Sequence, residues 1–431
     1  MKAIQIGIIG FGTIGTGVVK NLKKNASLLS ERLGAQIKIK GIADIDIKKK
    51  RSVSVPQSLL TKDAHKLLND PDIDIIVELV GGYEPAKSFI LKALKNGKHI
   101  VTANKALLAV HGKELAAAAE KAGRSIFYEA SVAGGIPIIK ALREGFVGNN
   151  ISSIFGIVNG TANYILTKMT KDGSEFSETL KEAQEKGYAE SDPTFDVEGD
   201  DSAHKLAILA RLASGYWIDY KDIYIEGISE ITEKDIEYAG ELGCVIKLLA
   251  IMKEKDNKIE ARVHPTLIAK DNLLSTINGV YNAVCVEGDV VGKTMFYGKG
   301  AGEDPTASAV ISDIVDIARN ILNNAPARIP SFTTVKKIKG VKKIDEFESR
   351  AYLRVSALDR PSVLAKIAGV LGKYEISISS VMQKERNVKG GTVPVLMLTH
   401  KAKERNLKNA LKELDRLSVI KSKTIMIRME D

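Results

Sequence analysis

Apolar and polar positions along the first 130 residues fall into blocks that predict strands separated by helices. Short apolar runs predict β-strands, and apolar residues at helical spacing predict amphipathic helices. The predicted strands cover residues 4–9, 37–43, 73–80, 99–102 and 125–130, and the predicted helices cover residues 12–30, 63–69, 85–96 and 105–121. Strands that alternate with helices pair in parallel through right-handed crossovers, so we expect a parallel α/β domain over residues 1–130.

A glycine-rich turn joins the first predicted strand to the first predicted helix. Its residues are Gly10, Phe11, Gly12, Thr13, Ile14 and Gly15. Gly10 would permit a tight bend, Gly12 would let backbone N–H groups approach a pyrophosphate, and Gly15 would allow close packing of helix on strand. The glycine spacing alone is a weak signal, since a purely structural turn can share it. Its place between a strand and a helix favours a Rossmann dinucleotide-binding domain.

A different pattern follows residue 130. Predicted helices cover residues 134–143, 177–186, 202–213 and 306–322, and predicted strands cover residues 151–158, 223–228, 259–265, 283–288 and 290–297. Because the strands no longer alternate one by one with helices, we expect an α+β domain with a mixed sheet over residues 131–325.

The last hundred residues predict a linker and a third domain. Residues 326–349 contain two prolines and a basic stretch with little periodicity, which is typical of a linker. Strand, helix, strand, strand, helix and strand are then predicted at residues 352–356, 361–371, 376–383, 391–399, 404–414 and 424–429. This βαββαβ order predicts a ferredoxin-like domain over residues 350–431.

Composition and charge exclude several classes of function. The 431 residues are 44% hydrophobic and 27% charged with a mean hydropathy of -0.04, which gives no sign of a membrane protein. The net charge is +10, but 63 basic residues are scattered among 53 acidic ones, so we expect a solvated surface and no nucleic-acid partner.

Cys244 and Cys285 lack metal-binding spacing and predict buried thiols in a reducing compartment. Residues 1–19 lack a cleavage signal, so we expect a cytoplasmic protein.

An acidic segment from Gly187 to Lys205 is the most informative internal stretch. It places six carboxylates within twelve residues, from Glu190 to Asp201. Asp201 and Lys205 lie four positions apart on a predicted helix, which puts a carboxylate and an ammonium on one face. By composition alone this would be a solvated loop followed by a surface ion pair.

Four separated motifs together resemble homoserine dehydrogenase over residues 1 to about 322. They are the segment from Gly187 to Lys205, the run from Thr102 to Lys105, the run from Tyr128 to Pro137, and the turn from Gly300 to Gly302. The resemblance implies reversible, nicotinamide-dependent interconversion of L-homoserine and L-aspartate 4-semialdehyde, in the biosynthesis of threonine, methionine and isoleucine. It also implies that residues 131–325 bind substrate and form the dimer contacts, in a homodimer or homotetramer.

The resemblance also implies roles for individual residues. Lys205 would be the proton donor, and Lys105 the second catalytic lysine, near nicotinamide and substrate. A positioned lysine suits this reaction, because reducing an aldehyde needs a proton for the developing alkoxide. Glu190 and Asp201 would contact the substrate, and Gly302 would lie close to both substrate and cofactor. Gly187 would contact the cofactor as well.

A monovalent cation, sodium in most of the family, is implied by the same resemblance. Its ligands would be largely backbone carbonyl groups, at Glu129, Val132, Gly134 and Ile136. The glycine-rich turn before Pro137 can aim carbonyl oxygens at a hard cation, although the same residues also suit a simple helix start with proline in its first turn.

The choice of nicotinamide cofactor rests on two conflicting signals. Asp44, at the end of the second predicted strand, could bind a ribose 2′-hydroxyl as in NAD enzymes. The basic run at residues 48–51 could pair with a 2′-phosphate as in NADP enzymes, although such runs are often solvated. We expect NADP as the main cofactor, with NAD as the alternative.

The C-terminal unit resembles an ACT regulatory domain, with its first strand–helix turn at residues 358–364 and its second strand at residues 376–383. ACT domains often bind amino acids, so the resemblance implies threonine as an effector. The glycine that the family commonly has in this turn is Ser362 here, and its Cβ would obstruct close approach of a ligand. Amino-acid sensing and a role in assembly alone therefore both remain open.

Two other functions compete with these expectations. An aspartate-semialdehyde dehydrogenase requires an activated cysteine, and neither cysteine lies in a recognisable catalytic turn. A non-catalytic amino-acid sensor could keep the same fold, but it would not need Lys105, Glu190, Asp201 and Lys205 together. Because the dinucleotide-binding pattern begins at residue 1, we expect a monofunctional enzyme without an adjoining kinase domain.

Overall fold

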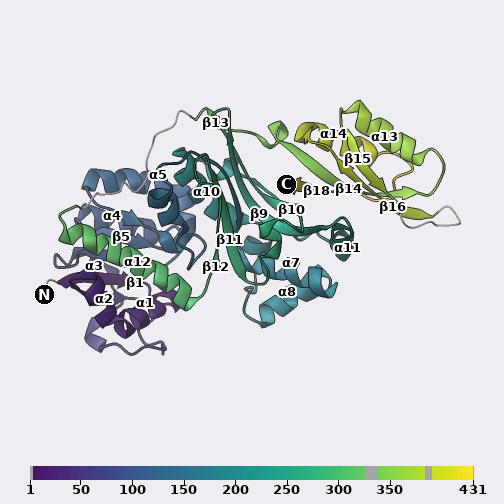
Figure 1. Ribbon diagram of the computed structural model, residues 1–431. Coiled ribbons are helices and arrows are strands. Elements are labelled where there is room, and N and C mark those ends of the chain that lie inside the picture. The colour runs from purple at the N-terminus through teal and green to yellow at the C-terminus, as the bar shows by residue number, and fades with distance from the viewer. Residues whose placement is uncertain (1–2, 326–337, 384–390, 431) are drawn as a thin grey trace. The chain divides into compact units, whose positions relative to one another are not determined.

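The computed structural model describes residues 3–325, 338–383 and 391–430, and the chain divides into two compact units (Figure 1). Unit 1 combines Met1–Gly160, Asp201–Ile223 and Val280–Ile338, and unit 2 combines Thr161–Asp200, Tyr224–Gly279 and Lys339–Asp431. Each unit is therefore built from segments that are far apart in the sequence. The predicted boundaries at residues 130/131, 325/326 and 349/350 remain predictions.

A six-stranded parallel sheet forms the centre of unit 1, in the order β3-β2-β1-β4-β5-β6. The strands are β1 (Ala3–Ile9), β2 (Gln36–Ala43), β3 (Leu60–Thr61), β4 (Ile75–Glu78), β5 (His99–Thr102) and β6 (Ile126–Phe127). The connecting helices are α1 (Thr13–Lys24), α2 (Ala26–Leu33), α3 (Ala64–Asn69), α4 (Ala86–Lys95) and α5 (Lys105–Ala122). This is the strand order of a Rossmann fold, as the sequence predicts.

The helix α12 (Glu303–Leu322) completes the core of this sheet although it lies far along the chain. Its apolar residues Val310 and Ile314 are fully buried in the same core as Ile6 and Ile8 of β1. In Figure 1 the green α12 lies beside the purple α1, and Lys20 Nζ of α1 pairs with Glu303 Oε1 at 2.6 Å. The sequence predicts the helix itself, but its pairing with α1 depends on the tertiary fold.

Unit 1 also contains three antiparallel strands and the helix that carries Asp201 and Lys205. The strands are β7 (Ile151–Ile157), β11 (Tyr281–Gly288) and β12 (Gly292–Lys299), and β11 pairs with both others. The helix α10 runs over Asp200–Ser214. The short α6 (Ile138–Lys140) continues into a π-helical turn at Ala141–Gly145.

Unit 2 contains the longest strands that the structure describes, β9 (Cys244–Lys255) and β10 (Lys258–Ala269), which form an antiparallel hairpin. Its other elements are α7 (Gly160–Asp172), α8 (Phe176–Glu185), α9 (Thr194–Val197), β8 (Tyr224–Ile225), α11 (Glu233–Glu241) and β13 (Gly340–Val341). The sequence pattern did not single out α7, α11 or β9. In β9 most positions are buried, so the strand shows an apolar run without the alternation that marks a half-exposed strand.

The C-terminal part of unit 2 is a ferredoxin-like βαββαβ fold. Its elements are β14 (Glu348–Leu358), α13 (Val363–Lys373), β15 (Ile378–Met382), β16 (Thr392–Thr399), β17 (Ala402–Lys403), α14 (Glu404–Leu414) and β18 (Ile425–Glu430). The sheet order is β18-β14-β16-β15, and α13 and α14 bury apolar residues such as Ile367 and Leu407 in one core. These observations confirm the predicted fold.

The last strand joins this domain to the β9–β10 hairpin within unit 2. β18 pairs antiparallel with β14 on one side and parallel with β10 on the other, where Thr266 lies opposite Arg428. Residues 326–337 of the predicted linker lie outside the described residues. Its described part contains β13, which also pairs with β10.

Several predicted elements differ from the structure, among them the helix predicted from residue 134, which begins at Ile138. The helix predicted over residues 12–30 is two helices, α1 and α2, which meet at Asn25, a residue type that favours helix ends. The strand predicted over residues 125–130 ends at Phe127, after which Glu129–Ser131 form a 3₁₀ turn. The strand predicted over residues 223–228 is only two residues long. None of the described helices is long and apolar enough to cross a membrane.

His99 gives a prediction for the pH dependence of stability. Burial, with a smaller contribution from Arg124, lowers the pKa of His99 to about 4, and its Nδ1 accepts the Ser125 N–H at 3.1 Å. Between this pKa and the ordinary value near 6.5, the unfolded chain binds a proton that the folded chain does not. The free energy of unfolding should therefore fall as pH decreases through this window, by roughly 3 kcal/mol for this residue.

The measurement is urea denaturation at pH 7 and pH 4.5 for the parent and for His99→Gln, which keeps a hydrogen-bond acceptor. The variant should lose less stability than the parent on acidification. His65→Gln, at an exposed position of α3, serves as the control and should behave as the parent does. Equal acid sensitivity in all three proteins would show that His99 does not titrate as described.

Candidate active site

The glycine turn after β1 meets the geometric requirements of a phosphate-binding loop. Gly10 has a φ of +101°, and a Cβ at this position would lie 2.6 Å from the Leu79 carbonyl oxygen. A Cβ at Gly15 would lie 2.2 Å from the Gly10 carbonyl oxygen, so the helix packs directly on the turn. A Cβ at Gly12, the N-cap of α1, would meet no atom within 4 Å. Gly10 and Gly15 are thus required by the fold, whereas the space at Gly12 is open.

The end of β2 contacts this turn through Asp44. Its Oδ2 accepts the Phe11 N–H at 2.6 Å, and its Oδ1 lies 3.2 Å from Nη2 of Arg51. The Arg51 guanidinium packs over the Phe11 ring at 4.4 Å and donates to the Phe11 carbonyl at 2.6 Å. Asp44 therefore holds the turn in place, and Arg51 neutralises its charge. Lys48, Lys49 and Lys50 are exposed.

Two lysines converge on one buried carboxylate elsewhere in unit 1. Lys205 Nζ lies 2.7 Å from Oδ2 of Asp201, and Lys105 Nζ lies 2.8 Å from Oδ1 of the same residue. The side chain of Asp201 is 3% exposed, that of Lys205 11% and that of Lys105 36%. Asp201 Oδ2 also accepts from Asn159 Nδ2 at 2.8 Å, and Lys205 donates to the Val158 carbonyl at 2.7 Å. The structure thus brings together three residues that the sequence predicted for one site.

Three elements deliver these side chains. Asp201 and Lys205 are one turn apart on α10, Val158 and Asn159 directly follow β7, and Lys105 is the first residue of α5. The N-terminus of α5 is capped by Asn104, whose Oδ1 accepts the Leu107 N–H at 3.1 Å. The sequence analysis did not identify Val158 and Asn159. The signal that could have found them is an Asn-Gly pair directly after a buried strand.

The pair of lysines determines the charge of Asp201. Burial alone would raise the pKa of this carboxyl, but the ammonium groups of Lys205 and Lys105 outweigh burial and hold the pKa well below its usual range. Asp201 is therefore ionised across the whole physiological pH range. An ionised carboxylate keeps both ammonium groups in place and leaves the less buried Lys105 partly open to solvent.

A second glycine turn belongs to unit 1. Gly302 has a φ of +115° and is the N-cap of α12. A Cβ at Gly300 would lie 2.0 Å from Cγ of Asn282, and a Cβ at Gly134 would lie 2.5 Å from the Gly300 carbonyl oxygen. The Gly300–Gly302 turn therefore packs against the segment that contains Gly134.

The segment predicted to bind a cation lies in this region. The backbone N–H of Glu129 donates to Asp313 Oδ2 at 2.7 Å, and the Glu129 carboxylate accepts the N–H groups of Ile139 and Lys140, both at 2.8 Å. Burial raises the pKa of Glu129 to about 7, although these hydrogen bonds oppose the shift. Among the described residues, no group of three or more His, Cys, Asp and Glu side chains could hold a metal. A cation here would therefore depend on backbone oxygens.

Glu190 and Gly187 belong to unit 2. Gly187 follows α8 with a φ of +72°, and Glu190 is exposed. The Gln184 side chain donates to the Glu190 carbonyl at 3.1 Å, and Asp192 Oδ1 accepts the Thr194 N–H at 3.1 Å. These contacts order the acidic segment locally. The predicted roles of Glu190 with substrate and of Gly187 with cofactor remain predictions.

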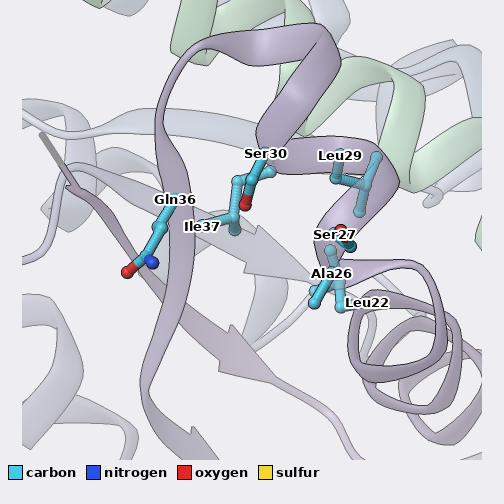
Figure 2. A pocket seen from close by; sticks show the side chains of 7 residues that line it. All are labelled: Leu22, Ala26, Ser27, Leu29, Ser30, Gln36 and Ile37. Atoms are coloured by element: carbon cyan, nitrogen blue, oxygen red, sulfur yellow. The ribbon is translucent and has the colours of Figure 1, made fainter. Parts of the chain in front are cut away.

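Figure 2 shows a pocket at a different place in unit 1, between α1, α2 and β2. It is lined by Leu22, Ala26, Ser27, Leu29, Ser30, Gln36 and Ile37. None of the predicted site residues lines this pocket, so we do not assign it to the active site.

Comparison with family models gives three matches along the chain. Residues 10–129 match "Homoserine dehydrogenase, NAD binding domain", residues 137–315 match "Homoserine dehydrogenase", and residues 351–418 match "ACT domain". The three matches follow one another in the order predicted from the sequence.

Named relatives and solved structures agree with these models. A homoserine dehydrogenase from Neisseria gonorrhoeae is 46% identical, covering 100% of this chain and 99% of its own length. One from Bacillus subtilis is 40% identical, with 100% and 99% covered. The crystal structure of a homoserine dehydrogenase from Thiobacillus denitrificans is 43% identical and gives a TM-score of 0.94, with 100% and 99% covered. A hyperthermophilic archaeal homoserine dehydrogenase mutant in complex with NADPH is 27% identical with a TM-score of 0.63, covering 73% of this chain and 97% of its own.

Three features together define a dinucleotide-dependent oxidoreductase: a Rossmann sheet with an open glycine turn, two lysines that converge on a buried carboxylate, and a C-terminal ACT domain. The full-length relatives then specify the reaction class. The chain belongs to the homoserine dehydrogenase family. The resemblance and the fold class predicted from the sequence are both confirmed.

Proposed function

We propose that this chain interconverts L-homoserine and L-aspartate 4-semialdehyde with Lys205 as the proton donor and acceptor. The observation that carries the proposal is the convergence of Lys205 and Lys105 on the buried Asp201 carboxylate. A bound nicotinamide supplies or accepts the hydride. Lys205 donates a proton to the aldehyde oxygen during reduction, and in the oxidative direction its neutral amine accepts the hydroxyl proton.

Asp201 and Lys105 have distinct roles in this proposal. Asp201 Oδ2 accepts from Lys205 and Asn159 while Oδ1 accepts from Lys105, so Oδ1 has a lone pair left for a substrate ammonium. Lys105 is the more exposed of the two lysines, and it is proposed to contact substrate and cofactor. Glu190 is proposed as a second acceptor for the substrate ammonium, and Gly302 as the point where the backbone approaches substrate and cofactor. Gly187 is proposed as a cofactor contact.

NADP is the proposed main cofactor, and NAD is the alternative. Phosphates would lie at the turn formed by Gly10, Phe11, Gly12, Thr13, Ile14 and Gly15, where the open space at Gly12 fits a phosphate group. The pairing of Arg51 with Asp44 supports NADP, because it neutralises the carboxylate that would repel a 2′-phosphate. The exposed Lys48, Lys49 and Lys50 add positive charge beside it.

A monovalent cation, sodium in our proposal, would bind to the backbone carbonyls of Glu129, Val132, Gly134 and Ile136. Two features support this fit. Ala133 and Gly134 both have positive φ, of 55° and 50°, which bends this segment sharply. The Glu129 carboxylate accepts two backbone N–H groups, which hold it in place, so we propose the backbone carbonyl oxygens of this segment as the ligands; a hard cation prefers oxygen ligands. Such a cation would order the segment next to the Gly300–Gly302 turn.

The experiment that tests the proposed reaction is oxidation of NADPH and of NADH by the purified protein with aspartate semialdehyde. Consumption of NADPH faster than NADH is expected. Repeating the assay in sodium-free buffer tests the cation, and the molar mass of the same sample by light scattering tests the proposed homodimer or homotetramer. Absence of turnover with either nucleotide, despite binding of the cofactor, would favour the amino-acid sensor.

Substitutions at two glycines separate cofactor binding from folding. Gly12→Ala should weaken NADPH binding about tenfold or more while leaving thermal stability unchanged, because its Cβ would enter only the open space. Gly15→Ala should destabilise unit 1, because its Cβ would collide with the Gly10 carbonyl. Fluorescence titration of NADPH and thermal melts measure both effects. Unchanged affinity in Gly12→Ala would contradict the placement of phosphate at this turn.

An amino-acid effector such as threonine is proposed for the ACT domain. Ser362, the N-cap of α13, has a φ of 71° and ψ of -2°, which is a left-handed conformation that suits glycine. Ser362→Gly should therefore relieve strain and open the turn to a ligand. We expect stronger inhibition by threonine in the variant than in the parent, together with a gain in stability of roughly 0.5 kcal/mol.

Ser377→Gly provides the matched control for this prediction. Ser377 is exposed just before β15 and is not in the left-handed region, so glycine there should only increase the entropy of the unfolded chain and destabilise the fold slightly. Inhibition curves for threonine and thermal melts of the three proteins are compared. Identical behaviour of both variants would leave assembly as the proposed role of the ACT domain.

A further inference from the structure

Glu78 is a buried carboxyl group at the carboxyl end of β4 for which the proposed reaction has no use. It is 0% exposed, and among the described residues no cation acts on it; the groups that do are Thr102, Val80 and Gly81. Burial raises the pKa of Glu78, while hydrogen bonds from Thr102, Val80 and Gly81 oppose the shift. A buried carboxyl without a cation costs free energy that an apolar residue would not, and its hydrogen bonds have to offset that cost.

The contacts of Glu78 connect two turns. Its Oε1 accepts the Val80 N–H at 2.7 Å, which orders the turn after β4, and its Oε2 accepts the Thr102 hydroxyl at 2.6 Å, at the end of β5. Glu78 and Thr102 are opposite each other in the parallel pairing of these strands. The turn after β4 also contacts the phosphate loop, because Gly10 packs against the Leu79 carbonyl. Ligands of an open α/β sheet bind at this edge.

Thr102 links Glu78 to Asn104, the residue before Lys105, by a second hydrogen bond. Its Oγ1 accepts the Asn104 N–H at 3.0 Å. Asn104 Nδ2 donates to the Gly82 carbonyl at 2.6 Å, and its Oδ1 caps α5 through the Leu107 N–H at 3.1 Å. Asn104 is therefore held at three points, one in the turn after β4, one in β5 and one in α5. Its neighbour Lys105 begins α5 with its backbone position fixed by these bonds.

We propose that Glu78 and Thr102 are positioning residues that act through Asn104 to fix Lys105 relative to the turn after β4 and thus to the cofactor. The inference rests on the proposed role of Lys105. Neither residue contacts the Asp201 carboxylate in the proposal. Their effect on the reaction is transmitted by the hydrogen bonds through Asn104, so it should disappear when the lysine side chain is absent.

A double-mutant cycle with Thr102→Val and Lys105→Ala tests this. Valine keeps the shape of Thr102 but removes the hydroxyl, which leaves Glu78 Oε2 and the Asn104 N–H without this partner. Thr102→Val should lower kcat/KM about tenfold in the parent and less than about twofold in the Lys105→Ala background. Thr102→Ser, which restores the hydroxyl, should stay within about twofold of the parent.

Controls distinguish positioning from general destabilisation. Thr179→Val removes another buried threonine hydroxyl, one that bonds the Glu175 carbonyl in α8, and should leave kcat/KM unchanged. If Thr102→Val does not fold, Glu78→Gln replaces it in the cycle. The glutamine side chain has one acceptor oxygen, whereas the Glu78 carboxylate has two, one for the Val80 N–H and one for the Thr102 hydroxyl. Equal losses in both backgrounds, or no loss at all, would overturn the proposal. If Lys105→Ala alone left activity unchanged, the assigned role of Lys105 would fail, and the positioning role with it.

Discussion

Replacing Lys205 with alanine should lower kcat for the reduction of aspartate semialdehyde at least about a thousandfold, while NADPH binding is retained. Lys205 is the more buried of the two lysines, and its ammonium is held by Asp201 Oδ2 and the Val158 carbonyl, both at 2.7 Å. No solvent molecule can replace a proton donor fixed in this way with the same orientation. The phosphate turn lies on α1 and does not depend on α10, so cofactor affinity should be unaffected.

The test compares steady-state kinetics and NADPH titration of the parent, Lys205→Ala and Lys181→Ala. Lys181 is an exposed lysine of α8, and its replacement should leave both kinetics and binding as they are in the parent. Asp201 keeps Lys105 and Asn159 as partners in Lys205→Ala, so the variant should fold. Undiminished turnover in Lys205→Ala would remove this residue from the mechanism.

The second large effect is expected on stability, from Arg428→Met. Arg428 Nε and Nη2 donate to the two carboxylate oxygens of Glu404 at 2.7 and 3.0 Å, and Nη1 pairs with Glu226 at 2.7 Å. The side chains of Arg428 and Glu404 are 1% and 0% exposed. Methionine fills similar space without the charge, which leaves Glu404 buried and without a cation. Such a loss costs about 3–5 kcal/mol.

Urea denaturation followed by circular dichroism measures this change. Adding Glu404→Gln to Arg428→Met should recover much of the loss, because the amide carries no charge and can still accept from Ser349, which bonds Glu404 at 2.9 Å. Lys373→Met breaks an exposed ion pair with Glu413 and should leave stability unchanged. A double variant that is less stable than Arg428→Met would show that the unpaired carboxylate is not the source of the loss.

The local elements could be predicted because each has a period that a short window reveals. The strand over His99–Thr102 and the helix over Glu404–Leu414 lie at the predicted residues. β9 was missed because its buried run resembles a helix segment as closely as a strand. The break at Asn25 was missed because two helices with one continuous apolar pattern have the same spacing as a single helix.

The candidate site could be predicted in part. Asp201 and Lys205 were expected on one helix face from their spacing. In the structure Lys205 Nζ lies 2.7 Å from the Asp201 carboxylate. Asn159 and the Val158 carbonyl were not predicted, since their only sequence signal is an Asn-Gly pair after a strand, which does not show that they meet Asp201 and Lys205. The capping of α5 by Asn104 likewise appears only with the structure.

The sequence by itself determined the βαβ order, the phosphate turn, the βαββαβ unit and the family, because these depend on local periodicity and on motifs in a fixed order. Only the tertiary structure decided which distant residues meet. It placed Lys105 of α5 2.8 Å from Asp201 of α10, α12 against α1, and Arg428 against Glu404. The physical reason is that local propensity acts over a few residues, whereas burial of charge and apolar surface selects partners by their place in the fold.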